Sequence, residues 1–492
     1  MAQPKNILLM IADDLGRDQI GCYGCKKIET PNIDGFAASG TRFDMAFTST
    51  ASCSGSRTVI YTGLHTHENG SYGLVAEKNG FRTFDNVETA PLLFNKLGYE
   101  TGIIGKVHVS PDYLYPWQLR QESESRDVAD VADRAERFFN DAKAENKPFF
   151  LTIGYVDPHR LLGSRGGFGN VDGNYDTRLS DRYYHPNDVE IPPFLNDLPE
   201  VRQELAEYYR SIHRLDQGIG MVLTALERCG AADNTLVLVL SDNGPPFVNS
   251  KTTLYDAGVR LPFLLRVPGQ PSGVVNPNLI SYVDILPTFL DWAGHGSMNT
   301  PTKAVGSRRG RSILPITSCE RRLPDWSSVY GSHTFHEITN YWPTRYMRTP
   351  RYKYHRNVCW KLDFPFAMDL YASLSFEGMR NSGTEFSPAM IGQRTLKDYI
   401  CRPPEELYDL EEDPAEIKNL AQDPGYKAIL EDMREAVEKW QEATGDLWLW
   451  RDGTSVARYR TYNYARDGLR IPDRFDFDVE DPGNRKLPAV KL

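Results

Sequence analysis

A cysteine, Cys53, lies in a segment of small and hydroxyl-bearing residues, TSTASCSGSR, that runs from Thr48 to Arg57. Arg57 follows Cys53 by four residues, so the two side chains share one face if a helix begins near Ser52. Hydroxyl residues such as those before Cys53 are suitable helix N-caps, and the first turn of a helix presents free N–H groups and a positive dipole. The segment therefore predicts a pocket for a tetrahedral anion with a reactive side chain at its base.

Carboxylate and amide side chains follow two strand-like apolar runs. Asp13 and Asp14 come directly after NILLMIA, and Asp242 and Asn243 come directly after TLVLVLS. Two carboxylates held close together in a cleft raise each other's pKa unless a cation neutralises them. Oxygen ligands of this kind suit a hard divalent cation, so these residues predict a calcium site, with magnesium or manganese as alternatives. The competing interpretation is that they are ordinary loop acids and turn formers.

Apolar runs alternate with amphipathic segments over the first two-thirds of the chain. Residues 101–109 and 148–156 are typical of buried strands, and residues 128–144 and 200–229 are typical of helices. This alternation predicts an α/β fold with a large, mostly parallel sheet sandwiched by helices. Ligands bind beyond the carboxyl ends of the strands in such a sheet. The polar groups at the predicted strand ends are Asp13 and Asp14, Lys106 and His108, Asp157 and His159, and Asp242 and Asn243.

The chain changes character near residue 344. Aromatic and basic runs such as TRYMRTPRYKYHRN predict antiparallel strands, residues 427–442 predict a helix, and the segment after Gly453 has no clear period. A chain of 492 residues is too long for one compact core, so two domains are expected. We place a catalytic domain at 1–343 and a smaller C-terminal α+β domain with an antiparallel sheet at 344–492.

Composition and charge limit the classes of partner. The formal net charge of −10 does not favour nucleic-acid binding, and an anionic substrate would need a local basic pocket. No stretch approaches the roughly 20 apolar residues that span a bilayer, and the N-terminus lacks a basic segment followed by a long apolar one. The sequence as given predicts a soluble cytoplasmic chain that does not bind membranes, or a mature form from which a leader was removed. The oligomeric state is left open, with a homodimer as one option.

The segment CSGSR, followed by TVIYTGLHTHENG, resembles the signature of the formylglycine-dependent sulfatases of the alkaline phosphatase superfamily. Further motifs occur in the family's order: ADD near the start, GKVH, DPHR, SDNG and Lys251. The resemblance implies an alkaline-phosphatase-like fold. It also implies that a formylglycine-generating enzyme oxidises Cys53 to an aldehyde, whose gem-diol attacks sulfur. The third motif position is usually proline or alanine, whereas this chain has Gly55.

The resemblance implies a role for each candidate residue. The metal would be bound by Asp13, Asp14, Asp242 and Asn243 together with the modified Cys53. Arg57 would stabilise the formylglycine, and Lys106 and Lys251 would hold sulfate oxygens. His108 would assist the nucleophile or the collapse of the hemiacetal, and His159 would face the leaving group. These roles agree with the chemistry, because a sulfuryl group needs fixed positive charge around its oxygens and a proton donor opposite the nucleophile.

Within the family, the chain is most similar to the N-sulfoglucosamine sulfohydrolases, or heparan sulfamidases. The motifs DPHR and GSHTFHE are the more selective ones, and they imply that Arg160, His336 and Glu337 line the substrate pocket. The alternative for these three residues is a polar strand edge at the domain boundary. The leading hypothesis is a sulfamidase acting on N-sulfated glucosamine. The segment YDAGVRLPF, with Arg260, resembles the generic sulfatase pattern and keeps an O-sulfatase acting on aryl or sugar sulfates open.

Other hypotheses remain. A phosphonate monoester or phosphodiester hydrolase of the same superfamily would use the same aldehyde on phosphorus. A sulfatase-like binding protein would keep Cys53 as a thiol, and Gly55 is the feature that leaves this hypothesis open. Cys53 could also be an inert thiol in a turn. A thiol phosphatase is disfavoured, because its arginine would have to lie further along the loop than Arg57.

Overall fold

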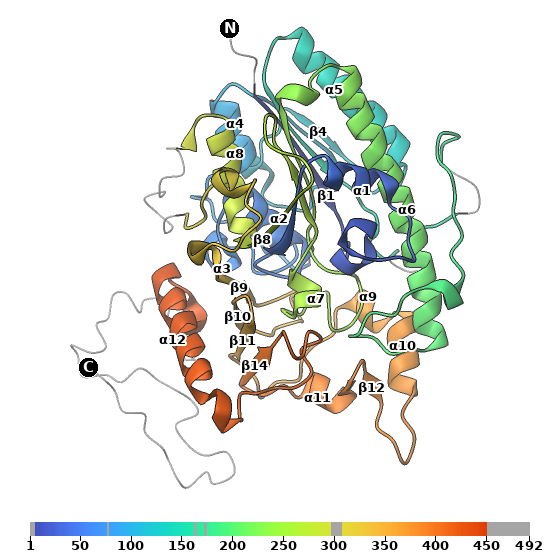
Figure 1. The fold of residues 1–492 in the computed structure, drawn as a ribbon, viewed down its shortest axis with the longest axis vertical. Coiled ribbons are helices and arrows are strands. Elements are labelled where there is room, and N and C mark those ends of the chain that lie inside the picture. The colour runs from blue at the N-terminus through green and yellow to red at the C-terminus, as the bar shows by residue number, and fades with distance from the viewer. Residues whose placement is uncertain (1–4, 76–77, 162–164, 172–174, 297–307, 450–492) are drawn as a thin grey trace, which may run out of the picture.

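The computed structural model describes residues 5–75, 78–161, 165–171, 175–296 and 308–449 (Figure 1). Within these residues a large mixed sheet has eight strands in the order β4-β3-β5-β1-β6-β7-β2-β8. Its strands are β1 (Asn6–Ala12), β2 (Thr41–Phe47), β3 (Glu100–Gly105), β4 (Leu119–Glu122), β5 (Phe149–Gly154), β6 (Thr235–Ser241), β7 (Phe263–Arg266) and β8 (Val274–Ser281). Strand β7 runs antiparallel to both of its neighbours, β6 and β2, and the remaining pairs are parallel. The predicted large, mostly parallel sheet is therefore confirmed.

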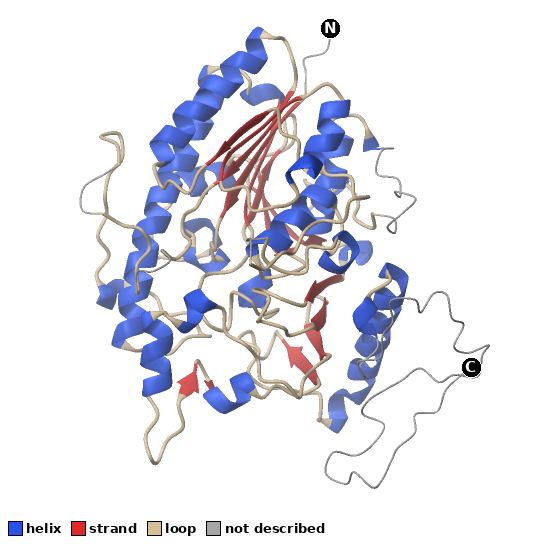
Figure 2. Cartoon of the chain, turned by 180° about the vertical axis from the view of Figure 1, so that it is seen from behind, coloured by secondary structure: helices blue, strands red, loops and turns tan. Residues whose placement is uncertain are grey.

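Strand β1 lies between β5 and β6 in the middle of the sheet, and all seven of its residues are buried there. Its side chains alternate between the two faces. Leu8 and Met10 contribute to the core that contains α1, α5 and α6, whereas Ile7, Leu9 and Ile11 contribute to the core that contains α2, α4 and α8. Helices consequently cover both faces, as Figure 2 shows.

The helices of the described chain differ widely in length. They are α1 (Pro31–Ala38), α2 (Cys53–Thr62), α3 (Thr66–Asn69), α4 (Ala90–Lys96), α5 (Val128–Ala144), α6 (Pro199–Arg228), α7 (Asp256–Val259), α8 (Ile285–Trp292), α9 (Met368–Tyr371), α10 (Leu374–Asn381), α11 (Leu396–Ile400) and α12 (Lys427–Thr444). Long amphipathic segments were predictable: α5 has the expected bounds, and α6 and α12 differ from expectation by at most two residues at either end. None of the helices in the described ranges is long and apolar enough to cross a bilayer.

A second, antiparallel sheet of four strands lies below the large sheet in Figure 1, in the order β14-β11-β10-β9. Its strands are β9 (Val329–His333), β10 (Thr344–Arg348), β11 (Tyr352–Asn357) and β14 (Glu405–Asp409), and a separate hairpin joins β12 (Met390–Ile391) to β13 (Arg394–Thr395). Helix α12 packs on this sheet through Leu430, Met433 and Val437, which share a core with Tyr354 and Leu407. The expected antiparallel strands are confirmed.

The division of the chain at residue 343 stays a prediction. Strand β9 precedes that residue and pairs with β10, which follows it, so the small sheet draws on both sides of the proposed boundary. The segment after Gly453, for which we expected no regular period, lies outside the described residues.

Candidate active site

Four adjacent parallel strands, β3, β5, β1 and β6, end at the same edge of the large sheet. Asp13 follows β1, Lys106 follows β3, and Asp242 follows β6. Strand β3 ends at Gly105 rather than at the predicted residue 109, so Lys106 and His108 belong to the loop beyond the strand. The strand ends bring together residues that are more than 200 positions apart in the sequence.

Helix α2 carries the cysteine. It begins at Cys53, directly after the extended Ser52 (φ −147°, ψ 129°), which confirms the helix start expected from the sequence. The side-chain oxygen of Ser52 does not cap the helix but lies 3.0 Å from His336 Nδ1. Cys53 is 1% exposed, and burial together with the Asp13 carboxylate raises the pKa of its thiol well above the ordinary value. An ionised thiolate is therefore disfavoured at this position.

Arg57 lies one helical turn after Cys53 and is completely buried. Its Nε donates to Asp242 Oδ2 at 2.8 Å, and its Nη1 donates to the carbonyl oxygen of Lys106 at 3.1 Å. Its Nη2 lies 4.0 Å from Asp13 Oδ1. Arg57 thus connects α2 to the ends of β1, β3 and β6.

Two buried lysines each contact one of the two acids after β1. Lys106 Nζ donates to Asp13 Oδ2, and Lys251 Nζ donates to Asp14 Oδ2 at 2.9 Å. Burial lowers the pKa of Lys106, but Asp13 outweighs it and raises the pKa to about 12. Both ammonium groups are therefore charged at neutral pH, in agreement with a site for an anionic group.

Two side-chain oxygens at the strand ends have no hydrogen-bond partner among the described residues. Asp13 Oδ1 and Asn243 Oδ1 are buried and accept no hydrogen bond among the described residues. The side-chain ligand atoms of Asp13, Asp14, Cys53 and His159 all lie within 4.8 Å of one another. Asp242 and Asn243 adjoin this group: Asp242 Oδ1 accepts from the backbone N–H of Asp14 at 3.2 Å, and Asn243 Nδ2 donates to Asp14 Oδ1 at 2.6 Å. The carboxylate and amide oxygens of Asp13, Asp14, Asp242 and Asn243 form a hard donor set that fits a divalent cation such as Ca²⁺ or Mg²⁺. The fit does not distinguish between these ions.

The pKa values of Asp13 and Asp242, the two acids that contact Arg57, shift in opposite directions. Burial alone would raise the pKa of Asp13, but the surrounding cations, Lys106 first, hold it well below the ordinary value. Burial and the charge of Asp13 raise the pKa of Asp242 to about 7. One carboxylate therefore holds a proton in part at neutral pH unless a further positive charge is present, which is the situation that a bound cation would relieve.

Two histidines, His108 and His159, line the cavity next to Cys53 and the lysines. His159 Nδ1 lies 2.6 Å from the carbonyl oxygen of Arg160, so this nitrogen carries the proton, and Nε2 accepts from Lys251 Nζ at 3.2 Å. Burial, followed by Lys251, lowers the pKa of His159. Burial and Lys106 lower the pKa of His108 well below the ordinary value. Both imidazoles are therefore neutral at neutral pH when no substrate is bound.

A cavity of about 440 Å³ opens above Cys53. Its wall combines basic, acidic and apolar side chains: Cys53, Leu74, Lys106, His108, Glu124, Arg126, Val156, His159, Arg160, Leu161, Lys251, His336, Glu337, Met368 and Asp369. The expected substrate residues Arg160, His336 and Glu337 are among them. Among the candidate metal residues, Cys53 lines the wall, whereas Asp13, Asp14, Asp242 and Asn243 do not.

Some of the polar residues expected at the site have side chains that already pair with other groups of the protein. Arg160 lines the cavity, but its guanidinium pairs with Glu204 and donates to the carbonyl oxygen of Pro246 at 2.8 Å. Asp157 is absent from the cavity wall because its carboxylate pairs with Arg126 and Arg214. Arg260, in the generic motif, also lies outside the cavity wall and donates to the carbonyl oxygen of Asp44.

The sequence analysis missed Asp369 and Arg126. Asp369 lies on the four-residue helix α9, and its Oδ2 accepts from Lys251 Nζ at 2.9 Å. Arg126 precedes α5, and its Nη2 donates to the carbonyl oxygen of His159. Neither residue lies in a motif or at the end of a predicted strand, so no local signal marks them.

Comparison with known proteins agrees with this architecture. The family model described as Sulfatase matches residues 5–295. Human N-sulphoglucosamine sulphohydrolase is 37% identical over 470 residues, which cover 91% of this chain and 92% of the human protein. An ulvan-active sulfatase of Formosa agariphila is 31% identical over 461 residues, covering 91% of this chain and 82% of the relative.

Solved structures share the fold at lower identity. A protein solved with its substrate D-glucosamine-2-N,6-O-disulfate has a TM-score of 0.64 at 20% identity, covering 90% of this chain and 99% of its own. The phosphonate monoester hydrolase of Agrobacterium radiobacter has a TM-score of 0.60 at 17% identity, covering 89% of this chain and 95% of its own. The fold is therefore alkaline-phosphatase-like, and the match over most of the chain shows that this protein belongs to the sulfatase family.

Proposed function

We propose that the protein is a sulfamidase that hydrolyses the S–N bond of N-sulfoglucosamine or of a sugar that ends in this unit. One observation carries the proposal. Lys106, Lys251, His108 and His159 line the cavity with the buried Cys53, and carboxylate oxygens of Asp13 and Asp14 lie within 4.8 Å of its sulfur. The chain is 37% identical over 91% of its length to human N-sulphoglucosamine sulphohydrolase. The alternative within the family is hydrolysis of a sulfate ester.

The nucleophile at position 53 is an oxygen in this proposal. Burial and Asp13 raise the pKa of the Cys53 thiol, so a thiolate mechanism is disfavoured. A formylglycine at this position would supply a hydroxyl group of its hydrate as the nucleophile. A formylglycine-generating enzyme would be the partner needed for maturation.

The charged residues orient the sulfuryl group. Lys106 and Lys251 both line the cavity, and their ammonium groups would donate to its oxygens as negative charge builds up there. The cation would be held by Asp13, Asp14, Asp242, Asn243 and the group at position 53, and calcium is the ion we propose. Such a cation would act as a Lewis acid and lower the pKa of a coordinated hydroxyl group.

The neutral histidines divide the proton transfers. His108 has a lowered pKa and a buried Nδ1 without a partner among the described residues, so it can accept the proton of the nucleophile. His159 Nε2 lies next to Lys251 Nζ, and both residues line the cavity. Once protonated, His159 would donate from Nε2 to the leaving nitrogen.

The test combines mass spectrometry with substrate comparison. The peptide containing position 53 is expected to be lighter by about 18 mass units than its thiol form, because CH2–SH becomes CHO in this nucleophile chemistry. Then kcat/KM is measured from sulfate release with N-sulfoglucosamine, glucosamine 6-O-sulfate and an aryl sulfate, and from phenol release with an aryl phosphonate. Preference for N-sulfoglucosamine supports the proposal. A higher kcat/KM for either sulfate ester or for the phosphonate contradicts it, and an unmodified peptide from the native host favours a binding protein.

A further inference from the structure

Three carboxylates line the cavity, those of Glu124, Glu337 and Asp369, and the last two interact with Lys251, one of the lysines that would hold a sulfate group. Asp369 comes from α9, and Glu337 comes from the loop after β9. An anionic sulfuryl group is repelled by carboxylates, so their presence on this wall calls for a different part of the substrate. Apart from the sulfuryl group, the scissile bond of a sulfamate contains a nitrogen, which is the part that these carboxylates could contact.

Asp369 is a buried acceptor. Its Oδ2 accepts from Lys251 Nζ at 2.9 Å, and its Oδ1 accepts from the backbone N–H of Leu370 at 2.9 Å. A carboxylate offers about four acceptor positions, so two remain for a ligand in the cavity. Burial opposes ionisation, but Lys251 outweighs it and holds the pKa of Asp369 well below the ordinary value. The group therefore faces the cavity as a carboxylate.

Glu337 lies beside it. Both residues belong to the same cavity wall, which Met368, the residue before Asp369, also lines. Burial raises the pKa of Glu337, the backbone of Met368 lowers it, and the charge of Asp369 raises it further. The ionisable groups that face the pair are Lys251, His159 and His336. Lys251 also pairs with Asp14, so it does not fully compensate the pair.

The nitrogen of a sulfamate differs from the bridging oxygen of a sulfate ester in two respects. It carries a hydrogen that can be donated, whereas the ester oxygen carries none. During cleavage the nucleophile oxygen forms a bond to sulfur and its proton passes to His108. His159 gives its proton to the nitrogen, which thereby gains positive charge. The S–N bond then breaks and its electron pair stays on nitrogen, which leaves as a neutral amine. The free amine takes up a further proton from solution and becomes an ammonium group at neutral pH.

We propose that Asp369 and Glu337 form an amine site that binds the substrate's nitrogen and stabilises its positive charge during S–N cleavage. The inference rests on the proposed function and assigns its preference for nitrogen over oxygen to two named residues. Groups aimed at charge that develops in the transition state lower the barrier because they need no reorganisation. An alcohol leaving group gains no such charge, so the pair would not favour it.

Asp369 could instead serve only to position Lys251. The two roles predict different results, because Lys251 would hold sulfate oxygens in every substrate. Loss of positioning lowers turnover of N-sulfates and O-sulfates by the same factor, whereas loss of the amine site lowers turnover of the N-sulfate alone.

The experiment compares wild type, Asp369→Asn, Glu337→Gln and the control Asp363→Asn, which removes an exposed carboxylate from the loop before α9. The first measurement is kcat/KM for N-sulfoglucosamine and for an aryl sulfate. Asp369→Asn is expected to lower the ratio of the two by about 100-fold, with a smaller loss in Glu337→Gln. Asp363→Asn is expected to leave the ratio unchanged. Equal losses on both substrates, or an unchanged ratio in both cavity variants, would overturn the inference.

The second measurement is competition by glucosamine, a cation, against N-acetylglucosamine, which is neutral. Wild type is expected to bind glucosamine more tightly, and each cavity variant is expected to lose about 10-fold of that preference. This binding readout does not require cleavage of an N-sulfate. Wild type that prefers glucosamine but releases no sulfate from N-sulfoglucosamine would refute the proposed function and leave the amine site standing. Wild type that releases sulfate but shows no preference for glucosamine would refute the amine site. If Asp369→Asn does not fold, Glu337→Gln decides both measurements.

Discussion

The methyl carbon of Thr50 lies 2.9 Å from the point that a Cβ on residue 55 would occupy. Gly55 is buried in the first turns of α2, and the hydroxyl oxygen of Thr50 lies 2.9 Å from His333 Nδ1. The chain therefore departs from the usual motif at residue 55 because Thr50 fills the space that a larger residue would need.

Gly55→Ala should be more favourable when Thr50 is first changed to serine. Alanine has the higher helix propensity, but its Cβ meets the Thr50 methyl group, which serine lacks while keeping the hydroxyl. We expect a coupling of about 1–2 kcal/mol between the two substitutions in urea unfolding. Additive effects of Gly55→Ala and Thr50→Ser would contradict this explanation.

A divalent cation should stabilise the protein through the strand-end acids. At about 100 times its Kd, Ca²⁺ is expected to raise the free energy of unfolding by about 3 kcal/mol over the chelated protein. Asp14→Asn should lose most of this response, and asparagine tolerates the positive φ of 66° at this position. Asp432→Asn, on the exposed face of α12, is the matched control and should respond like wild type. No difference between calcium and chelator in wild type would remove the case for a resident cation.

Acid should destabilise the fold through its buried histidines. Burial lowers the pKa of His333 and of His336 from 6.5 to about 3. Above pH 6.5 the imidazoles are neutral in both states. Below it the unfolded chain takes up protons that the folded chain cannot, so the free energy of unfolding falls as pH falls. The loss at pH 5 is about 2 kcal/mol for each histidine.

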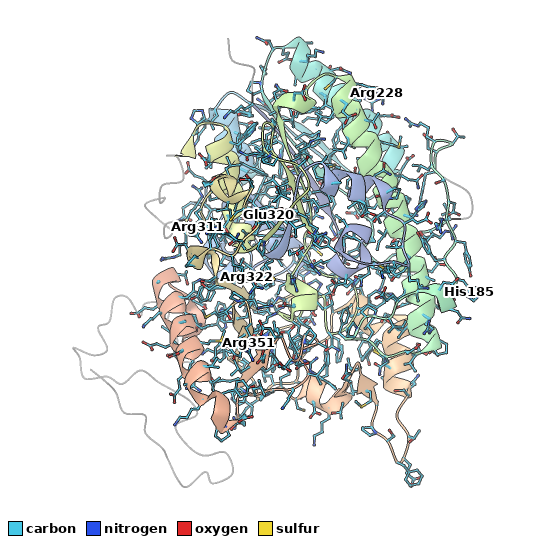
Figure 3. All side chains as sticks on the ribbon, viewed as in Figure 1. His185, Arg228, Arg311, Glu320, Arg322 and Arg351 are labelled. Carbon is cyan, nitrogen blue, oxygen red and sulfur yellow. The ribbon has the colours of Figure 1, made fainter. Side chains whose placement is uncertain are left out.

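His333→Gln should remove about 2 kcal/mol from the difference in unfolding free energy between pH 7 and pH 5. His185→Gln should leave that difference unchanged, because His185 is exposed at the edge of the molecule (Figure 3). The same difference in wild type and in His333→Gln would show that this ring is not excluded from protonation.

Turnover should rise as the solution becomes more acidic. His159 must carry a proton to act as the acid, and burial together with Lys251 lowers its pKa. The protonated fraction therefore increases as pH falls through and below 6.5, and kcat should increase with it in measurements between pH 8 and pH 5. His159→Gln should lower kcat by about 100-fold and flatten this limb of the profile. A wild-type kcat that rises with pH instead would exclude His159 as the acid.

Much of the site was predictable because its chemistry lies at the ends of strongly apolar strands. The runs before Asp13 and Asp242 are buried at every position, so strand and polar end could be recognised together. The start of α2 was expected from the hydroxyl residues before Cys53, and the helix begins there, although the Ser52 hydroxyl contacts His336 and does not cap the helix.

Asp369 could not be found in this way. Helix α9 has four residues, too few to show a period, and Asp369 reaches the site through a contact with Lys251, 118 positions earlier. The pairing of Arg160 could not be predicted for the same reason. Its partner Glu204 lies 44 positions later on α6, and only the folded chain shows that the guanidinium is already paired.

The loop before Cys53 is held by strands that come late in the chain. Ser332 donates its backbone N–H to the carbonyl oxygen of Ser49, and the Tyr346 hydroxyl donates to that of Thr48. A ribosome would have to synthesise almost 300 further residues after Cys53 before these contacts could close. Until then these contacts cannot hold the loop, and in the folded chain Cys53 is 1% exposed in the wall of the cavity. Any enzyme that modifies Cys53 therefore has a limited time in which to act, and faster folding would shorten it.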